Sequence, residues 1–156
     1  MRFPAAVLCA FAFFSMASPQ DDMNELIDAV YRADGEAVFR SLTLENRQAL
    51  SMMVTMFRLA PGEVAEQLRQ ELQVQLSTSE ISCMREEDLV RIILDSPMFR
   101  NEIPWPRHMV SIESCSMAGD TALVTVTIEG EPNSYSYPMV LQEGGWKLAT
   151  EFFPEN

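Results

Sequence analysis

The chain has 156 residues, with 11 Lys and Arg against 23 Asp and Glu, which gives a formal net charge of −12 at pH 7. Hydrophobic residues make up 47% and charged residues 22%, a balance typical of a folded chain long enough for one domain with its own core. So acidic a chain is unsuited to binding nucleic acid or an anionic membrane surface, because both need clustered basic side chains.

The first 17 residues have the pattern of a secretory signal peptide. Met1 and Arg2 form a short basic start, residues 3–14 are largely apolar, and Ser15 and Ala17 supply small residues at positions −3 and −1 of a cleavage site. A membrane anchor is the alternative, but the apolar run of about 15 residues is shorter than the roughly 20 that cross a bilayer. We therefore expect a secreted or periplasmic chain with no membrane span after signal removal.

Residues 18–95 have the periodicity of helices. The first helix begins near Asp21 and Asp22, and Gly35 is expected to end or bend it. Its apolar stripe comprises Met23, Leu26, Ile27, Val30 and Tyr31. After it we expect a short segment over 36–42 and helices over 44–59, 63–76 and 85–95, the last two separated by a linker at 77–79.

Three methionines on the second long helix, Met52, Met53 and Met56, are open to two interpretations. Core filling is favoured, because methionine adapts to irregular gaps. If these side chains are exposed instead, they form the leading candidate surface for binding a protein.

The chain then changes from a helical period to the alternation of strands. Residues 96–106 contain Pro97, Pro104 and Pro106, so we expect an irregular connector there. Strands are expected over 109–115, 121–129, 134–142 and 146–153, joined by short turns rich in glycine. The sequence thus predicts an α+β fold, in which N-terminal helices pack on the apolar face of a C-terminal four-stranded antiparallel meander.

Two cysteines, Cys83 and Cys115, remain after signal removal. In an oxidising compartment an even number favours a disulfide between them, which would close a loop of about 30 residues. Two inert thiols are one alternative. The other is a reactive Cys83 thiolate, activated by the N-terminus of the helix that follows.

The C-terminal third resembles the end of small exported domains of the NTF2-like superfamily, which have the cystatin-like, cone-shaped α+β fold. The resemblance rests on the strand Asp120-Thr121-Ala122-Leu123-Val124 and on the hairpin Gly145-Trp146-Lys147-Leu148. It implies that residues 18–156 form one domain whose curved sheet wraps around helices and leaves a cavity at the open end. It also implies a possible homodimer. No catalytic residue of the enzymatic members can be transferred, because no matching acid–base pair is found.

Few residues are candidates for chemistry. His108 is the sole histidine and could act as a base, although a structural role is favoured. The aromatic residues Trp105, Tyr135, Tyr137 and Trp146 could line a ligand pocket or pack in the core. The sequence has no phosphate loop, dinucleotide fingerprint or metal-ligand spacing, so neither a cofactor nor a metal is expected.

Two functional classes remain. The favoured one is an exported non-enzymatic domain that binds a protein, a peptide or an apolar small molecule through its cavity or an exposed face. The alternative is a small cavity enzyme that transfers protons with a carboxylate. The two differ in one feature: an enzyme of this type needs an Asp or Glu that projects into an enclosed apolar pocket, where desolvation would raise its pKa.

Overall fold

A computed structural model describes residues 17–150. The predicted signal peptide, except for Ala17, and residues 151–156 lie outside the described residues. Within this range the chain forms seven α-helices, one short 3-10 helix and four strands. These are α1 (Pro19–Tyr31), α2 (Gly35–Arg40), α3 (Leu44–Leu59), α4 (Pro61–Glu71), α5 (Thr78–Ser82), α6 (Glu86–Asp95), α7 (Pro97–Glu102), η1 (Arg107–Met109), β1 (Val110–Ala118), β2 (Thr121–Ile128), β3 (Ser134–Gln142) and β4 (Gly145–Leu148).

The sheet is the predicted antiparallel meander, in the order β1-β2-β3-β4. Its inner face is apolar, since Val124 is fully buried and lies opposite Tyr137 on β3. Its outer face is polar, and there the Thr125 and Ser136 hydroxyls lie 3.2 Å apart. The alternation read from the sequence gives the correct inner face for β2, β3 and β4, and the α+β prediction is confirmed.

The turn between β3 and β4 depends on two residues with positive φ. Glu143 has φ 52° and Gly144 has φ 78°. A two-residue hairpin in which both central residues are left-handed matches the twist of the flanking strands, and glycine adopts this conformation at little cost. The strand that follows is shorter than predicted: it ends at Leu148, and residues 151–153 lie outside the described residues.

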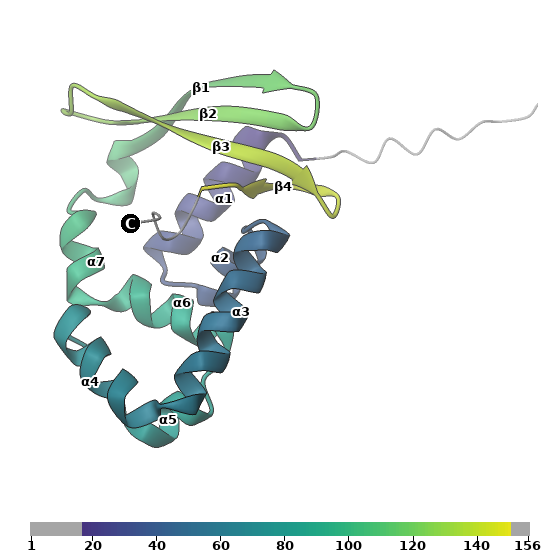
Figure 1. Cartoon of the computed structure of the whole chain (residues 1–156). Coiled ribbons are helices and arrows are strands. Elements are labelled where there is room, and N and C mark those ends of the chain that lie inside the picture. The colour runs from purple at the N-terminus through teal and green to yellow at the C-terminus, as the bar shows by residue number, and fades with distance from the viewer. Residues whose placement is uncertain (1–16, 151–156) are drawn as a thin grey trace, which may run out of the picture.

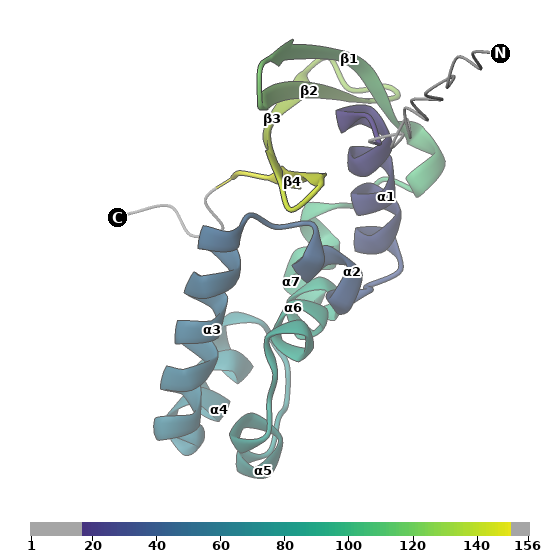
Figure 2. The same ribbon diagram turned by 90° about the vertical axis from the view of Figure 1, so that its right-hand side faces the viewer.

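The helices form two groups with different relations to the sheet. Helix α1 packs against the inner face of the sheet, where it contacts β1, β2 and β4. Helix α2 packs on α6. Helix α3 begins beside β4, where the Asn46 side chain donates to the Leu148 carbonyl oxygen, and runs to the end of the molecule farthest from the sheet, where α4 and α5 lie (Figures 1 and 2). Buried residues of both groups nevertheless belong to one continuous core cluster.

Several helix limits differ from the prediction, and the starts of α1 and α2 differ because each depends on a capping residue. Helix α1 begins after Ser18, which accepts the Asp21 amide in a capping box, and not at Asp21 and Asp22 themselves. The expected end residue Gly35 is instead the first residue of α2, after the N-cap Asp34. Helix α4 ends at Glu71, five residues earlier than expected.

Two segments expected to be irregular are helical. The linker at 77–79 contains the start of α5, where Ser77 and Glu80 form a capping box. The connector at 96–106 contains α7, which begins at Pro97 after the N-cap Ser96. Proline is well suited to the first position of a helix, because its missing N–H would have no partner there. Pro97 therefore marks the start of a helix and not a break.

The structure contradicts the predicted disulfide. Both Cys83 and Cys115 are free thiols, Cys83 exposed and Cys115 half-buried. A disulfide requires Cα atoms within about 7 Å. Cys83 follows α5 and Cys115 lies on β1, and these elements are at opposite ends of the molecule (Figures 1 and 2). Cys83 is the C-cap of α5 and lies two residues before Arg85, the N-cap of α6, so it is outside the first turn of the helix that follows.

The exposures of the two thiols predict different rates of alkylation. Under native conditions we expect iodoacetamide to modify Cys83 faster than Cys115, because the Cys83 side chain is open to solvent. Mass spectrometry of the digested protein, sampled over time, would follow each cysteine separately. After unfolding in guanidinium the two rates should converge. A peptide in which Cys83 and Cys115 are joined would contradict the structure.

Candidate functional site

A cavity of about 560 Å³ lies between α1, α6, α7 and the inner face of the sheet. Its lining is predominantly apolar. Residues from each wall include Val30 on α1, Ile93 on α6, Phe99 on α7 and Val126 on β2. The volume is within the range of pockets that hold small molecules, and apolar walls of this kind favour an apolar ligand.

The apolar stripe of α1 faces α6, α7 and the sheet, and the cavity lies between these elements. Met23 and Leu26, which are almost fully buried, fix α1 against the core, while the neighbouring Ile27 and Val30 are only partly buried. All four side chains line the cavity. One apolar stripe therefore supplies both core contacts and a cavity wall.

The structure brings three of the five predicted site residues together. Trp105, Tyr135 and Tyr137 line this cavity. His108 does not line it; it lies exposed on η1, between Arg107 and Met109. Trp146 is buried in the core on β4, with 5% of its surface exposed, and lines a different pocket.

Trp105 is fixed by two hydrogen bonds from segments distant in sequence. The Tyr31 hydroxyl donates to the Trp105 carbonyl oxygen at 2.8 Å, and the Trp105 indole Nε1–H donates to Glu131 Oε1 at 3.2 Å. These bonds join the end of α1, the segment after α7 and the turn between β2 and β3. Trp105 is thereby held at the cavity by both the helical and the strand half.

Two tyrosines that line the cavity, Tyr31 and Tyr137, have raised pKa values. Burial raises the pKa of Tyr137, and the neighbouring Tyr135 raises it further. Burial also raises the pKa of Tyr31, an effect that the positive charges of Arg107 and Arg100 oppose. Both phenols therefore stay protonated at neutral pH, available as neutral hydrogen-bonding groups.

The acid–base group that a cavity enzyme would need is not evident. Among the described residues that line the cavity, the one carboxylate is Glu102, at the end of α7. Its side chain is exposed to solvent and not enclosed by the apolar walls. The geometry of the cavity is therefore better suited to holding a ligand than to transferring a proton.

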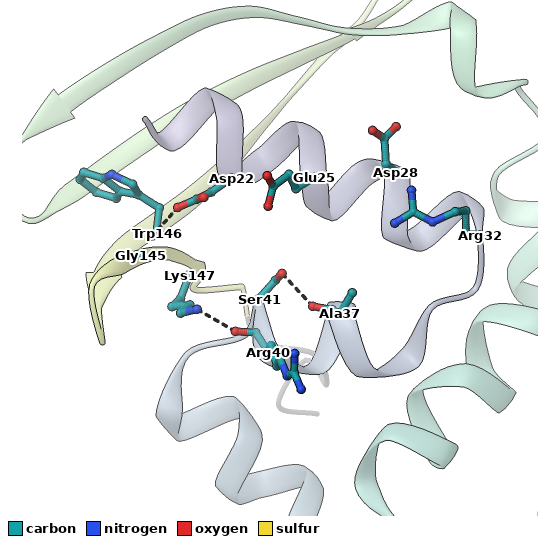
Figure 3. Close-up of a pocket in the computed structure, with 10 residues that line it drawn as sticks. All are labelled: Asp22, Glu25, Asp28, Arg32, Ala37, Arg40, Ser41, Gly145, Trp146 and Lys147. Carbon is teal, nitrogen blue, oxygen red and sulfur yellow. Dashed lines mark hydrogen bonds between the residues drawn. The ribbon is translucent and has the colours of Figure 1, made fainter. Parts of the chain in front are cut away.

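A second pocket, of about 500 Å³ and polar, lies between α1, α2 and β4 (Figure 3). Asp22 accepts the Trp146 backbone N–H at 2.7 Å, and Lys147 Nζ donates to the Arg40 carbonyl oxygen at 2.9 Å. Figure 3 shows the Trp146 indole turned away from this groove. These contacts close the edge of β4 and attach it to the helices, which gives the groove a structural role.

The methionines of α3 divide between the two interpretations. Met53 packs against the core, as expected, whereas core filling is wrong for the other two: Met52 is 68% and Met56 62% exposed. Leu59, one turn further along the same helix, is 82% exposed. An apolar strip on α3 is therefore the second candidate binding surface.

Sequence reasoning missed Tyr31 and Phe99 as cavity residues. Tyr31 was assigned to a core stripe, although a tyrosine needs a partner for its hydroxyl, and here that partner is Trp105. Phe99 lies on α7, in the segment read as irregular. The pair Ser96-Pro97, an N-cap followed by proline at the first helical position, was the signal for α7.

Comparisons with protein-family models, with curated proteins and with solved structures find no match for this chain. Within residues 17–150, no cluster of three or more His, Cys, Asp or Glu side chains is arranged to hold a metal ion. In the same range, every helix is too short or too polar to cross a membrane.

Proposed function

We propose that this protein is an exported binding protein that takes up an apolar small molecule in the cavity between α1, α6, α7 and the sheet. The apolar cavity of about 560 Å³ is the observation that carries the proposal. Its walls come from segments far apart in sequence, so a ligand would contact both halves of the fold. The signal-peptide pattern of residues 1–17 supports the exported location.

Membership of the NTF2-like superfamily remains a prediction. The resemblance of the C-terminal third implied a cavity formed by a sheet and helices, and a cavity of that kind is consistent with it. The alternative of a cavity enzyme is less well supported, because the carboxylate at the cavity, Glu102, is exposed. Proton transfer at neutral pH is favoured by a desolvated acid whose pKa is raised.

A substitution that fills the cavity tests the proposed function. The neutral fluorescent probe N-phenyl-1-naphthylamine should bind the wild-type protein with increased emission. Val30→Phe adds an aromatic ring to the partly buried wall of α1, so we expect probe binding to weaken at least tenfold. A fluorescence titration measures both affinities, and circular dichroism checks that the variant is folded.

Leu59→Phe is the matched control, because it adds the same ring to the exposed strip of α3. We expect this variant to bind the probe like the wild type. If Val30→Phe binds normally and Leu59→Phe changes the affinity, the α3 strip is the binding surface and the cavity proposal fails. An absence of probe binding to the wild type would also contradict the proposal.

A further inference from the structure

The hydroxyl of Tyr137 is the polar group of the cavity that remains available to a ligand. Tyr137 is half-buried on β3, opposite the fully buried Val124, and lines the cavity. None of the hydrogen bonds between residues 17–150 involves this hydroxyl, which is also not sealed from solvent. Solvent can reach this hydroxyl in the empty cavity, so a ligand that fills the cavity would displace that water, and the phenol would lose hydrogen-bonding energy unless a ligand oxygen replaced it.

The other polar groups that line the cavity are already used or open to solvent. The Tyr31 hydroxyl and the Trp105 indole N–H both donate to protein oxygens. Tyr135 is 39% exposed, so water can satisfy its hydroxyl. Tyr137 is thus the position where a hydrogen bond to the ligand would gain most.

The charges around the cavity disfavour an anionic ligand group. Among the described residues that line the cavity, Glu102 is the one that carries a formal charge. Arg107 is near, but its guanidinium donates to Asp28 Oδ1 at 2.6 Å and to the Val110 carbonyl oxygen at 2.8 Å. Arg100 is paired with Asp95 at 3.3 Å. A carboxylate inside the cavity would lose its hydration without gaining a free cation.

We propose that the ligand is a neutral, mainly apolar molecule with a hydroxyl or carbonyl oxygen that forms a hydrogen bond with Tyr137. This inference rests on the proposed binding function and adds the chemical class of the ligand. Tyr137 is then the residue that selects an oxygenated molecule over a plain hydrocarbon. The protonated phenol can donate to a carbonyl or exchange a hydrogen bond with a hydroxyl.

Three probes with the same ring system test this selection: naphthalene, 2-naphthol and 2-naphthoate. Their displacement of N-phenyl-1-naphthylamine from the full chain is measured by fluorescence. A hydroxyl costs desolvation, so a cavity without a partner for it would bind naphthalene more tightly than 2-naphthol. We expect the reverse order in the wild type, with 2-naphthol about fivefold tighter than naphthalene and 2-naphthoate weakest.

Two variants assign the preference to one hydroxyl. In Tyr137→Phe, naphthalene should bind at least as tightly as 2-naphthol, because the apolar wall is kept and the oxygen partner is lost. Ser136→Ala removes a hydroxyl from the adjacent residue on the outer face, where Ser136 lies beside Thr125, and should keep the wild-type order. Tyr137→Phe with an unchanged preference for 2-naphthol would overturn the inference.

The wild-type measurements separate the inference from the function on which it rests. If N-phenyl-1-naphthylamine binds but naphthalene competes better than 2-naphthol, the cavity binds ligands and the inference about oxygen is overturned. If 2-naphthoate is the tightest competitor, the inferred neutrality is overturned. If the fluorescent probe does not bind, the proposed function itself fails. The ranking needs no variant, so it stands even if Tyr137→Phe does not fold.

Discussion

Replacing Gly35 with alanine is expected to destabilise the protein by about 3 kcal/mol and to lower its melting temperature by roughly 10 °C. A Cβ at this position would lie 2.2 Å from the Glu87 carbonyl oxygen and 2.8 Å from the Arg91 backbone nitrogen. Both are backbone atoms of α6, so neither can move aside without shifting the helix. The substitution should therefore force α2 and α6 apart, and thermal unfolding followed by circular dichroism measures the loss.

Gly62→Ala is the control, because Gly62 also lies near the start of a helix. A Cβ there would have Thr78 Cγ2, at 4.0 Å, as its nearest neighbour, which is ordinary contact. Alanine restricts the unfolded chain more than glycine does, so we expect no loss and a gain of up to about 1 kcal/mol. Equal effects of the two substitutions would contradict the close packing of α2 on α6.

Replacing Leu42 with alanine is expected to cost about 3–4 kcal/mol in unfolding free energy. Leu42 is fully buried and forms a parallel bridge with Leu148 on β4. Beside it, the Leu148 N–H donates to the Ser41 carbonyl oxygen at 2.7 Å, and the Thr43 N–H donates to the Leu148 carbonyl oxygen at 3.2 Å. The cavity left by alanine would lie where the helices join the sheet, and chemical denaturation measures its cost.

Leu59→Ala removes the same atoms from a side chain that is 82% exposed on α3. We expect its effect on stability to stay within about 0.5 kcal/mol, because an exposed leucine loses little burial. A cost of the same size as that of Leu42→Ala would mean that the α3 strip is covered in solution. In that case the strip would be an interface and not a free surface.

The sequence predicted the sheet more accurately than the helices. Ala122, Val124 and Val126 are buried and alternate with the exposed or half-buried residues Leu123, Thr125 and Thr127, so the period of two predicts which side chains of β2 face inward. Helix limits depend instead on single capping residues, such as Ser77 and Ser96, which resemble loop residues when capping is not considered. This difference explains why α5 and α7 were missed.

The candidate site was predicted in part. Trp105, Tyr135 and Tyr137 were selected as aromatic residues near the sheet, and all three line the cavity. Trp146 has the same chemical character and is nevertheless buried in the core on β4. No local pattern distinguishes Trp146 from Tyr137. The difference arises only in the folded chain, where Tyr137 lines the cavity and Trp146 is 5% exposed.

By itself, the sequence determined the elements whose signals are local. Strand alternation, short turns and helical stripes establish the α+β class, because each depends on residues close together in the chain. The tertiary structure alone decided which of these residues meet. The separation of Cys83 from Cys115, the contact of Gly35 with α6 and the cavity between α1, α7 and the sheet each join residues far apart in sequence. Such contacts arise from the packing of whole elements, which no local pattern specifies.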